Sequence, residues 1–182
     1  MKITPTAIAD VLVIAPKVFA DSRGFFFESF NHRAFCDATG LNANFVQDSH
    51  SHSAKGVLRG LHFQAPQAQG KLVRVLRGAV QDVAVDLRPG SATQGQYAST
   101  VLAQDEHQLV WIPPCFAHGF LVLSDSADVV YKTTTYYAPE HEHCLAWNDL
   151  SVAIPWQLST PPLLSAKDQA GQTLASALQK VQ

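Results

Sequence analysis

His62 is the residue whose sequence neighbours best suit it to act as a general base. It lies between Leu61 and Phe63, so on a β-strand its side chain faces away from both apolar neighbours. Arg59 and Lys71 place positive charge nearby in the sequence. A neighbouring cation favours neutral imidazole, the form that accepts a proton near neutral pH. A hydrogen-bonded structural histidine fits the same pattern, so these residues alone leave both interpretations open.

Three further positions combine a functional side chain with a local structure that could present it. His118 follows a turn fixed by Pro113-Pro114 and precedes a glycine that permits close backbone approach. Tyr131 lies in an alternating strand and could donate a proton, although a half-buried strand tyrosine is the ordinary interpretation. Arg23 lies in a glycine turn before the aromatic run 25–27, where it could hold a phosphate beside a nucleobase. A core histidine and a surface turn are the structural alternatives for His118 and Arg23.

Two His-x-His pairs raise the question of a metal site. His50 and His52 are two residues apart, as are His141 and His143, and on a strand each pair would share one face. A zinc or iron site needs three or four converging ligands, often with a carboxylate. Because spacing alone does not provide them, solvated loop histidines are the simpler interpretation.

The segments that must position these residues are short and mostly extended. Strands are predicted over 57–63, 72–76, 82–87, 108–112, 120–123 and 129–137, separated by glycine, proline and aspartate turns. Many short strands at this spacing indicate a β-sandwich or barrel. One helix is predicted from about Asn31 to Gly40. A second follows Ser165, where 165–168 has capping-box form, and continues through Leu174 to Val181.

The bulk properties restrict the class of protein. At 182 residues with 47% hydrophobic residues, the chain is expected to form one domain, residues 1–182. Thirteen Lys plus Arg against 15 Asp plus Glu give a net charge of −2, which does not favour nucleic acid. Three widely spaced cysteines without a CxxC pair indicate a reducing compartment. The apolar run 11–15 is too short for a signal or membrane segment, so a soluble cytoplasmic protein is expected.

Three familiar catalytic motifs do not occur in the sequence. It has no GxGxxG or GxxxxGK[ST] loop, which argues against a nicotinamide oxidoreductase or a P-loop enzyme. It has no GxSxG elbow for a serine hydrolase.

A series of short motifs follows in order from about residue 10 to 168. They are Asp21-Ser-Arg-Gly-Phe-Phe, Gln47-Asp48, Gly56-Val-Leu-Arg-Gly-Leu-His-Phe-Gln64, Lys71-Leu-Val-Arg-Val, Asp82-Val-Ala-Val-Asp-Leu-Arg88, Phe116-Ala-His-Gly-Phe-Leu-Val-Leu123, Val130-Tyr-Lys-Thr, Pro139-Glu-His-Glu142, Trp147-Asn-Asp149 and Leu164-Ser-Ala-Lys-Asp168. No single motif is decisive, but together the chain closely resembles the dTDP-4-dehydrorhamnose 3,5-epimerase family of the cupin superfamily.

The resemblance implies an all-β fold, a cupin-type jelly-roll β-barrel with a few short helices, usually as a homodimer. It implies epimerisation of dTDP-4-dehydro-6-deoxy-D-glucose at C3 and C5 to dTDP-4-dehydro-L-rhamnose, in dTDP-L-rhamnose biosynthesis. The natural partner is then a dTDP-sugar, with no nucleic acid or membrane, and no cofactor is expected.

The resemblance also implies roles for individual residues. His62 removes the protons beside the ketone, Asp168 orients His62, Tyr131 returns a proton on the opposite face, and Lys71 steadies the enolate oxygen. This set agrees with what proton removal beside a ketone requires: a base, a positive charge at the oxygen and an acid across the plane. The positions that match substrate contacts are Arg23, Glu28, Gln47, Asp48, Ser49, Arg59, His118, Glu142 and Lys167.

Some residues depart from the related patterns. Metal-binding cupins resemble a His-x-His pattern, and Gln64 stands at the second histidine, so we expect no metal. Within the epimerase pattern, Ser49 replaces a common Asn, Cys115 a usual Gly, and Gly70 a common Ala. Ser49 leaves one ligand hydrogen bond open, and Cys115 leaves the tightness of its turn open.

Three alternatives remain at this stage. One is a relative that inverts only C3 or only C5 for another deoxysugar. A second is a non-catalytic nucleotide-sugar-binding cupin, which the complete set of acid, base and lysine disfavours. A third is a metal-dependent cupin dioxygenase, which Gln64 disfavours.

Overall fold

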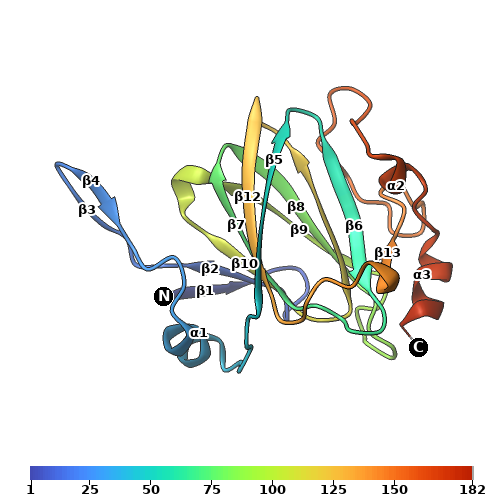
Figure 1. Ribbon diagram of the computed structural model, residues 1–182, viewed down its shortest axis with the longest axis horizontal. Coiled ribbons are helices and arrows are strands. Elements are labelled where there is room, and N and C mark those ends of the chain that lie inside the picture. Colours follow the sequence, from blue (N-terminus) through green and yellow to red (C-terminus); the bar gives the residue numbers. More distant parts are fainter. Residues whose placement is uncertain (182) are drawn as a thin grey trace.

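The computed structural model describes residues 1–181 and consists mainly of antiparallel strands (Figure 1). The strands are β1 (Lys2–Pro5), β2 (Leu12–Ala15), β3 (Phe19–Asp21), β4 (Gly24–Phe26), β5 (Gln47–Ala54), β6 (Leu58–Gln64), β7 (Lys71–Arg77), β8 (Ala79–Asp86), β9 (Tyr97–Ala103), β10 (Leu109–Ile112), β11 (Phe116–Val122), β12 (Ser126–Thr133) and β13 (Glu142–Cys144). The helices are α1 (His32–Thr39), α2 (Ala166–Gln169) and α3 (Leu174–Lys180), with 3₁₀ turns η1 (Gln104–Glu106) and η2 (Pro139–His141).

Two sheets face each other and form the body of the molecule. The six-stranded sheet has the order β1-β2-β10-β7-β12-β5, and the five-stranded sheet has the order β13-β6-β11-β8-β9. A third, two-stranded sheet, the β3–β4 hairpin, projects away from this body (Figure 1). The predicted sandwich or barrel of short strands is therefore confirmed.

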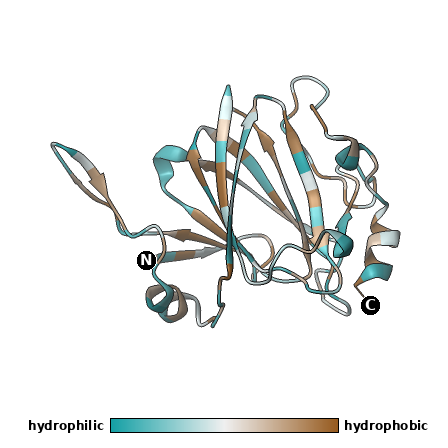
Figure 2. Ribbon diagram, in the orientation of Figure 1, coloured by the Kyte–Doolittle hydropathy of each residue, from teal (hydrophilic) through white to brown (hydrophobic). Residues whose placement is uncertain are grey.

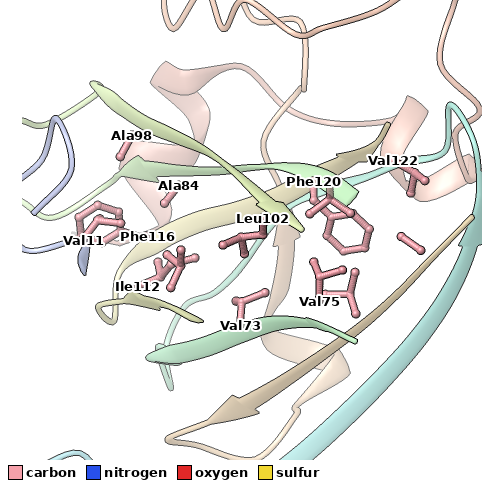
Figure 3. Close-up of a cluster of buried hydrophobic side chains, with 14 of the residues drawn as sticks. Val11, Val73, Val75, Ala84, Ala98, Leu102, Ile112, Phe116, Phe120 and Val122 are labelled. Atoms are coloured by element: carbon pink, nitrogen blue, oxygen red, sulfur yellow. The ribbon is translucent and has the colours of Figure 1, made fainter. Parts of the chain in front are cut away.

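The main core fills the space between the two sheets. Side chains on alternate positions of the facing strands meet there, as Figure 3 shows for Val73 and Val75 of β7 opposite Phe120 and Val122 of β11. Full burial of one such side chain contributes roughly 1.5–3 kcal/mol. In Figure 2, hydrophobic residues lie along the strands of both sheets, and hydrophobic and hydrophilic residues alternate on β6.

Two smaller cores attach the helices to the outer faces of the sheets. Helix α1 packs on the six-stranded sheet, where the Phe35 ring lies edge-on to Phe45 and Trp111. The C-terminal segment covers the five-stranded sheet, where Ala177 of α3 is buried beside Leu61 and Phe63. None of the helices among residues 1–181 combines the length and apolar character of a membrane span.

Of the two predicted helices, the first is confirmed and the second is not. Helix α1 has the expected caps: the Asn31 side chain accepts a hydrogen bond from Ala34 N, and Gly40 takes the left-handed conformation. The predicted single helix after Ser165 is wrong, because it is divided into α2 and α3. Between them the chain is extended and joins the end of β13: Gln172 N donates to Cys144 O, and Ala146 N donates to Gln172 O. The Thr173 side chain then caps α3 separately.

The strand predictions hold for β6, β7, β8 and β10 within a few residues. The segment predicted at 120–123 begins earlier, at Phe116, and the one predicted at 129–137 ends at Thr133. Strand β5 received no prediction of its own, because its alternating serines and histidines contain no apolar pattern.

Candidate active site

A cavity of about 330 Å³ lies between the two sheets. Its walls come from β5, β7 and β12 on one side and from β6, β11 and β13 on the other. It is lined by Gln47, Ser49, Ser51, Arg59, His62, Phe63, Gln64, Gln69, Lys71, His118, Gly119, Phe120, Tyr131, Thr133, Tyr137, Glu142 and Lys167.

On two strands, the side chains that face the barrel core are followed along the same face by side chains that line the cavity. On β12 the row that contains Ala127 and Val129 continues to Tyr131, and on β7 the row of Val75 and Val73 continues to Lys71. The same alternation that builds the core therefore places a phenol and an ammonium on one wall.

Arg59 and His62 reach the cavity together because strand β6 is irregular. On the neighbouring strand β11, His118 pairs with His62 and Phe120 pairs with Arg59. Two residues that are three positions apart on β6 therefore pair with two residues that are two positions apart on β11. Such a β-bulge changes which residues share a face. It lets two residues three apart line one cavity, where strict alternation would separate them.

His62 forms a dyad with the buried carboxylate of Asp168. The distance from Nε2 to Oδ1 is 2.6 Å. Oδ1 also accepts from Gly60 N at 3.2 Å, and Oδ2 accepts from the Ser165 hydroxyl at 2.6 Å. Burial alone would raise the pKa of Asp168, but these hydrogen bonds outweigh it and hold the pKa at about 2. The carboxylate is therefore ionised and fixes the hydrogen on Nε2, which leaves Nδ1 to accept a proton.

The first turn of α2 supplies this carboxylate. The Ser165 side chain caps the helix by accepting from Asp168 N at 3.2 Å, as the capping-box pattern predicts. The Asp168 carboxylate, however, bonds the Ser165 hydroxyl and the dyad histidine. The helix cap thus holds the carboxylate that orients His62.

Lys71 is buried in the cavity wall, and its ammonium donates to the His62 carbonyl at 3.3 Å. Burial lowers its pKa to about 8, against the opposing attraction of the Glu142 and Asp82 carboxylates. A buried ammonium close to the histidine backbone is suited to stabilise negative charge that develops on a bound ligand.

Tyr131 stands on the six-stranded sheet, while the His62 dyad stands on the five-stranded sheet. Its hydroxyl makes no hydrogen bond to any of residues 1–181. The cavity therefore has a histidine–carboxylate pair on one wall and, among residues 1–181, a phenol without a hydrogen-bond partner on the other.

A second histidine–carboxylate pair lies beside the first. The His118 Nε2 atom is 2.8 Å from Asp82 Oδ2, both side chains are buried, and His118 is the cross-strand partner of His62. His118 also lines the cavity, and the hydrogen bond to Asp82 fixes the orientation of its ring there.

A charged network forms the rim. Lys167 lies 2.8 Å from Glu142, and the Tyr137 hydroxyl donates to Glu142 at 2.7 Å. Burial acts to raise the pKa of Glu142, but hydrogen bonds from Lys167 and Tyr137 give a net lowering. The hydrogen bond to Glu142 raises the pKa of Tyr137 to about 12. Tyr137 was not predicted as a site residue, because it falls within the strand predicted over 129–137. Strand β12 ends at Thr133, and the adjacent tyrosines Tyr136 and Tyr137 beyond it are the signal in the sequence that points to this position.

Three of the predicted substrate contacts lie outside this cavity in the single chain. Arg23 is exposed on the β3–β4 hairpin and pairs with Asp21 at 2.6 Å. Glu28 accepts a hydrogen bond from Asn31, and Asp48 pairs with Lys132 on the outer face of the six-stranded sheet.

The structure also shows the surroundings of the residues that depart from the family pattern and of the two His-x-His pairs. Cys115 keeps the left-handed turn at φ 64°, a conformation that favours glycine. Ser49 lines the cavity and accepts from Gln47. The Gln64 amide hydrogen-bonds to backbone atoms of residues 67, 136 and 138. His50 and His52 share one face of β5, whereas His141 and His143 lie on η2 and β13.

Comparison with known proteins decides the family. The family model described as dTDP-4-dehydrorhamnose 3,5-epimerase matches residues 5–176. The chain belongs to this family. The dTDP-4-dehydrorhamnose 3,5-epimerase of Pseudomonas aeruginosa is 56% identical over 177 residues, covering 97% of this chain and 98% of that protein. The Escherichia coli K12 enzyme of the same name is 53% identical over 175 residues, covering 96% and 95%.

A solved structure of a family member has the same fold. The dTDP-6-deoxy-D-glucose-3,5-epimerase of Legionella pneumophila, in complex with dTDP-4-keto-L-rhamnose, superposes with a TM-score of 0.94 at 47% identity, covering 100% of this chain and 98% of that one. The match to the epimerase family and the superposition on this structure confirm the all-β, cupin-type jelly-roll fold and the isomerase class that the sequence motifs predicted.

Proposed function

We propose that this epimerase inverts C3 and C5 of dTDP-4-dehydro-6-deoxy-D-glucose and so forms dTDP-4-dehydro-L-rhamnose for dTDP-L-rhamnose biosynthesis. One observation carries the proposal: a histidine–carboxylate dyad and a free tyrosine occupy opposite walls of one cavity that also holds a buried lysine. The ligand in the Legionella pneumophila structure, dTDP-4-keto-L-rhamnose, supports this choice of substrate.

The reaction begins with removal of a proton from a carbon next to the C4 ketone. His62 accepts that proton at Nδ1, because Nε2 already donates to Asp168. Negative charge then develops on the ketone oxygen as the enolate forms. The Lys71 ammonium stabilises this charge, a contribution typically worth about 10²–10³-fold in rate for one oxyanion donor.

Inversion requires that the proton return on the opposite face. Tyr131 supplies it, since its hydroxyl is on the wall that faces His62 and has no partner among residues 1–181. The same base and acid then act at the second carbon on the other side of the ketone. No step in this sequence calls on a metal or a redox cofactor, because every transfer is of a proton.

The nucleotide end of the substrate binds at the rim. Arg59 and Lys167 supply donors for the diphosphate oxygens, His118 Nδ1 can accept a hydrogen bond from a sugar hydroxyl, and Tyr137 offers a half-exposed aromatic face. The side chains of Gln47, Ser49 and Glu142 complete the polar lining.

The proposal includes a homodimer. Arg23 and Glu28 match substrate-contact positions, but Arg23 stands on a hairpin that projects from the body, with Phe25 and Phe26 exposed beside it (Figure 1). A second copy would bury these aromatic side chains and would bring the Arg23 of one chain toward the cavity of the other. Asp48 would lie at the same contact, on the outer face of the six-stranded sheet.

We further propose that the enzyme acts in the cytoplasm, without nucleic acid or membrane partners, and supplies sugar for carbohydrates such as lipopolysaccharide O-antigen. The free cysteines Cys36, Cys115 and Cys144 agree with a reducing compartment.

Incubation with dTDP-4-dehydro-6-deoxy-D-glucose in deuterated water tests the central proposal. We expect one deuteron at C3 and one at C5, together with the L-rhamno product. Exchange at one carbon only would identify a mono-epimerase. A protein that binds the substrate without any exchange would be a binding module, and the catalytic proposal would fail.

A further inference from the structure

Three potential metal ligands converge behind the catalytic histidine. They are His62 Nε2 on β6, Cys144 Sγ on β13 and Asp168 Oδ1 on α2, and these atoms lie within 4.8 Å of one another. Cys144 is the direct cross-strand partner of His62, and its sulfur is 4.0 Å from Asp168 Oδ1. Among residues 1–181 this is the one group of three such side chains at this spacing.

The catalytic steps leave Cys144 unused. Its thiol is buried, does not line the cavity, and has only the Leu145 carbonyl and Asp168 within reach. A thiol, an imidazole and a carboxylate together form a donor set that suits Zn²⁺ and related thiophilic ions, and that Mg²⁺ and Ca²⁺ disfavour.

The two distances from Asp168 Oδ1 are close to those in a bound-ion site, and the distance from Nε2 to Sγ is at most 4.8 Å. Metal–ligand bonds of about 2.0–2.3 Å in a tetrahedral site place ligand atoms roughly 3.3–3.6 Å apart. The 2.6 Å contact between Nε2 and Oδ1 must therefore open, and the 4.0 Å contact between Sγ and Oδ1 must close, each by less than about 1 Å. The His62 side chain is a quarter exposed and, of the three ligands, is the one that lines the cavity, so an ion would enter past its ring.

We propose that Zn²⁺, or another thiophilic divalent ion, binds between His62, Cys144 and Asp168 and inhibits the enzyme. On binding, the ion forms bonds to Nε2, Sγ and Oδ1. The ring hydrogen moves from Nε2 to Nδ1, and the thiol hydrogen leaves as one proton. The nitrogen that faces the substrate then holds a hydrogen and no lone pair, so it cannot accept a proton. The inhibitory effect, though not the binding, rests on the proposed role of His62 as base.

Metal titrations of the metal-free wild type and of Cys144→Ala test the site. Co²⁺ and Cd²⁺ report a bound thiolate through a ligand-to-metal charge-transfer absorption, which is independent of activity. Zn²⁺ is then titrated against deuterium exchange of the substrate and removed with EDTA. Cys36→Ala and Cys115→Ala serve as matched controls, because these cysteines lie outside the cluster.

We expect the wild type and both control variants to show the absorption band and a reversible loss of exchange over the same range of metal concentration. Cys144→Ala should keep turnover close to wild type in the absence of metal and lack the band. Its inhibition should need at least about 10–100-fold more Zn²⁺, since loss of even an indirect ligand contact costs that much affinity. Cys144→Ser, which preserves the polar group, provides the same comparison if the alanine variant does not fold.

Two results would overturn the proposal. A band that survives in Cys144→Ala and disappears in a control variant would place the site elsewhere, and equal Zn²⁺ sensitivity of wild type and Cys144→Ala would do the same. A Cys144-dependent band without loss of exchange would refute the inhibition while leaving the metal site. Failure of the proposed function itself is distinguishable, because the metal-free wild type would then show no exchange at all.

Discussion

Replacement of Lys71 by methionine should make the enzyme more stable and much less active. Burial lowers the Lys71 pKa from 10.5 to about 8, even though Glu142 and Asp82 oppose the shift. The folded protein therefore holds this proton less tightly than the unfolded chain does. At about 1.4 kcal/mol per pKa unit, the charged lysine costs on the order of 3 kcal/mol at neutral pH. Methionine matches the aliphatic stem of lysine and lacks the ammonium, so Lys71→Met should raise the free energy of unfolding by up to about 3 kcal/mol.

The pH dependence of this gain identifies its cause. Because the folded pKa is the lower one, the cost is fully present below about pH 8 and disappears as the pH rises through 10.5, where lysine is neutral in both states. The advantage of Lys71→Met, measured by urea unfolding at a series of pH values, should therefore shrink steadily across this window. Lys55→Met, at an exposed lysine that lies 4.0 Å from Asp125, should show no comparable gain at any pH.

The activity of Lys71→Met, in contrast to its stability, should decrease. Without the ammonium, both deuterium exchange and net inversion should fall by about 10²–10³-fold, the usual effect of removing one donor at a developing oxyanion. A variant that is less stable than wild type, or a gain that persists unchanged at pH 10.5, would refute the buried-cation explanation. Unchanged exchange would refute the role of Lys71 in stabilising the enolate.

Four further variants separate the remaining roles. His62→Ala should fold and lose exchange by at least about 10²–10⁴-fold, because general-base catalysis is worth this much; near wild-type turnover of the folded variant would exclude His62 as the base. Tyr131→Phe should still exchange substrate hydrogen for deuterium while net inversion falls steeply, since His62 returns the proton to the face it left. Loss of exchange together with inversion, or full inversion, would each contradict the assignment of Tyr131 as the acid. Arg59→Ala and Arg23→Ala should each weaken the affinity for dTDP by about 10–100-fold, as expected for loss of a charge-assisted hydrogen bond of roughly 1.5–3 kcal/mol. Titration calorimetry that finds both affinities unchanged would remove this role from the two arginines.

The fold could be predicted where side chains alternate between the core and another environment. Strand β8 was found in this way, strand β7 through its run of β-branched and other apolar residues, and helix α1 through its caps Asn31 and Gly40. The break between α2 and α3 could not be predicted, because it depends on hydrogen bonds between Gln172 and the chain beyond β13. The residues around a position do not indicate which distant segment its backbone will hydrogen-bond to.

The candidate site was predictable only in part for the same reason. Asp168 lies 106 residues after His62, and the residues near it indicate only a helix cap. The resemblance to the family paired the two, and the 2.6 Å contact agrees with that pairing. The bulge that directs Arg59 and His62 into one cavity was not predicted, although Gly60 between them, at φ 113°, is the kind of strand glycine that often marks a bulge. The position of Arg23 outside the cavity depends on the path of the hairpin.

Strand β5 lines the cavity but does not take part in the hydrophobic cores that stabilise the fold. Its inward residues Ser49 and Ser51 line the cavity, and β5 contributes no side chain to the three hydrophobic cores described for residues 1–181. The strand is held instead by its backbone pairing with β12 along its full length. Substitutions at these serines can therefore reshape the space around a bound sugar without opening a void in the core. If the sugar binds in this cavity as proposed, substitutions on β5 can change which deoxysugar is accepted at a small cost in the free energy of unfolding.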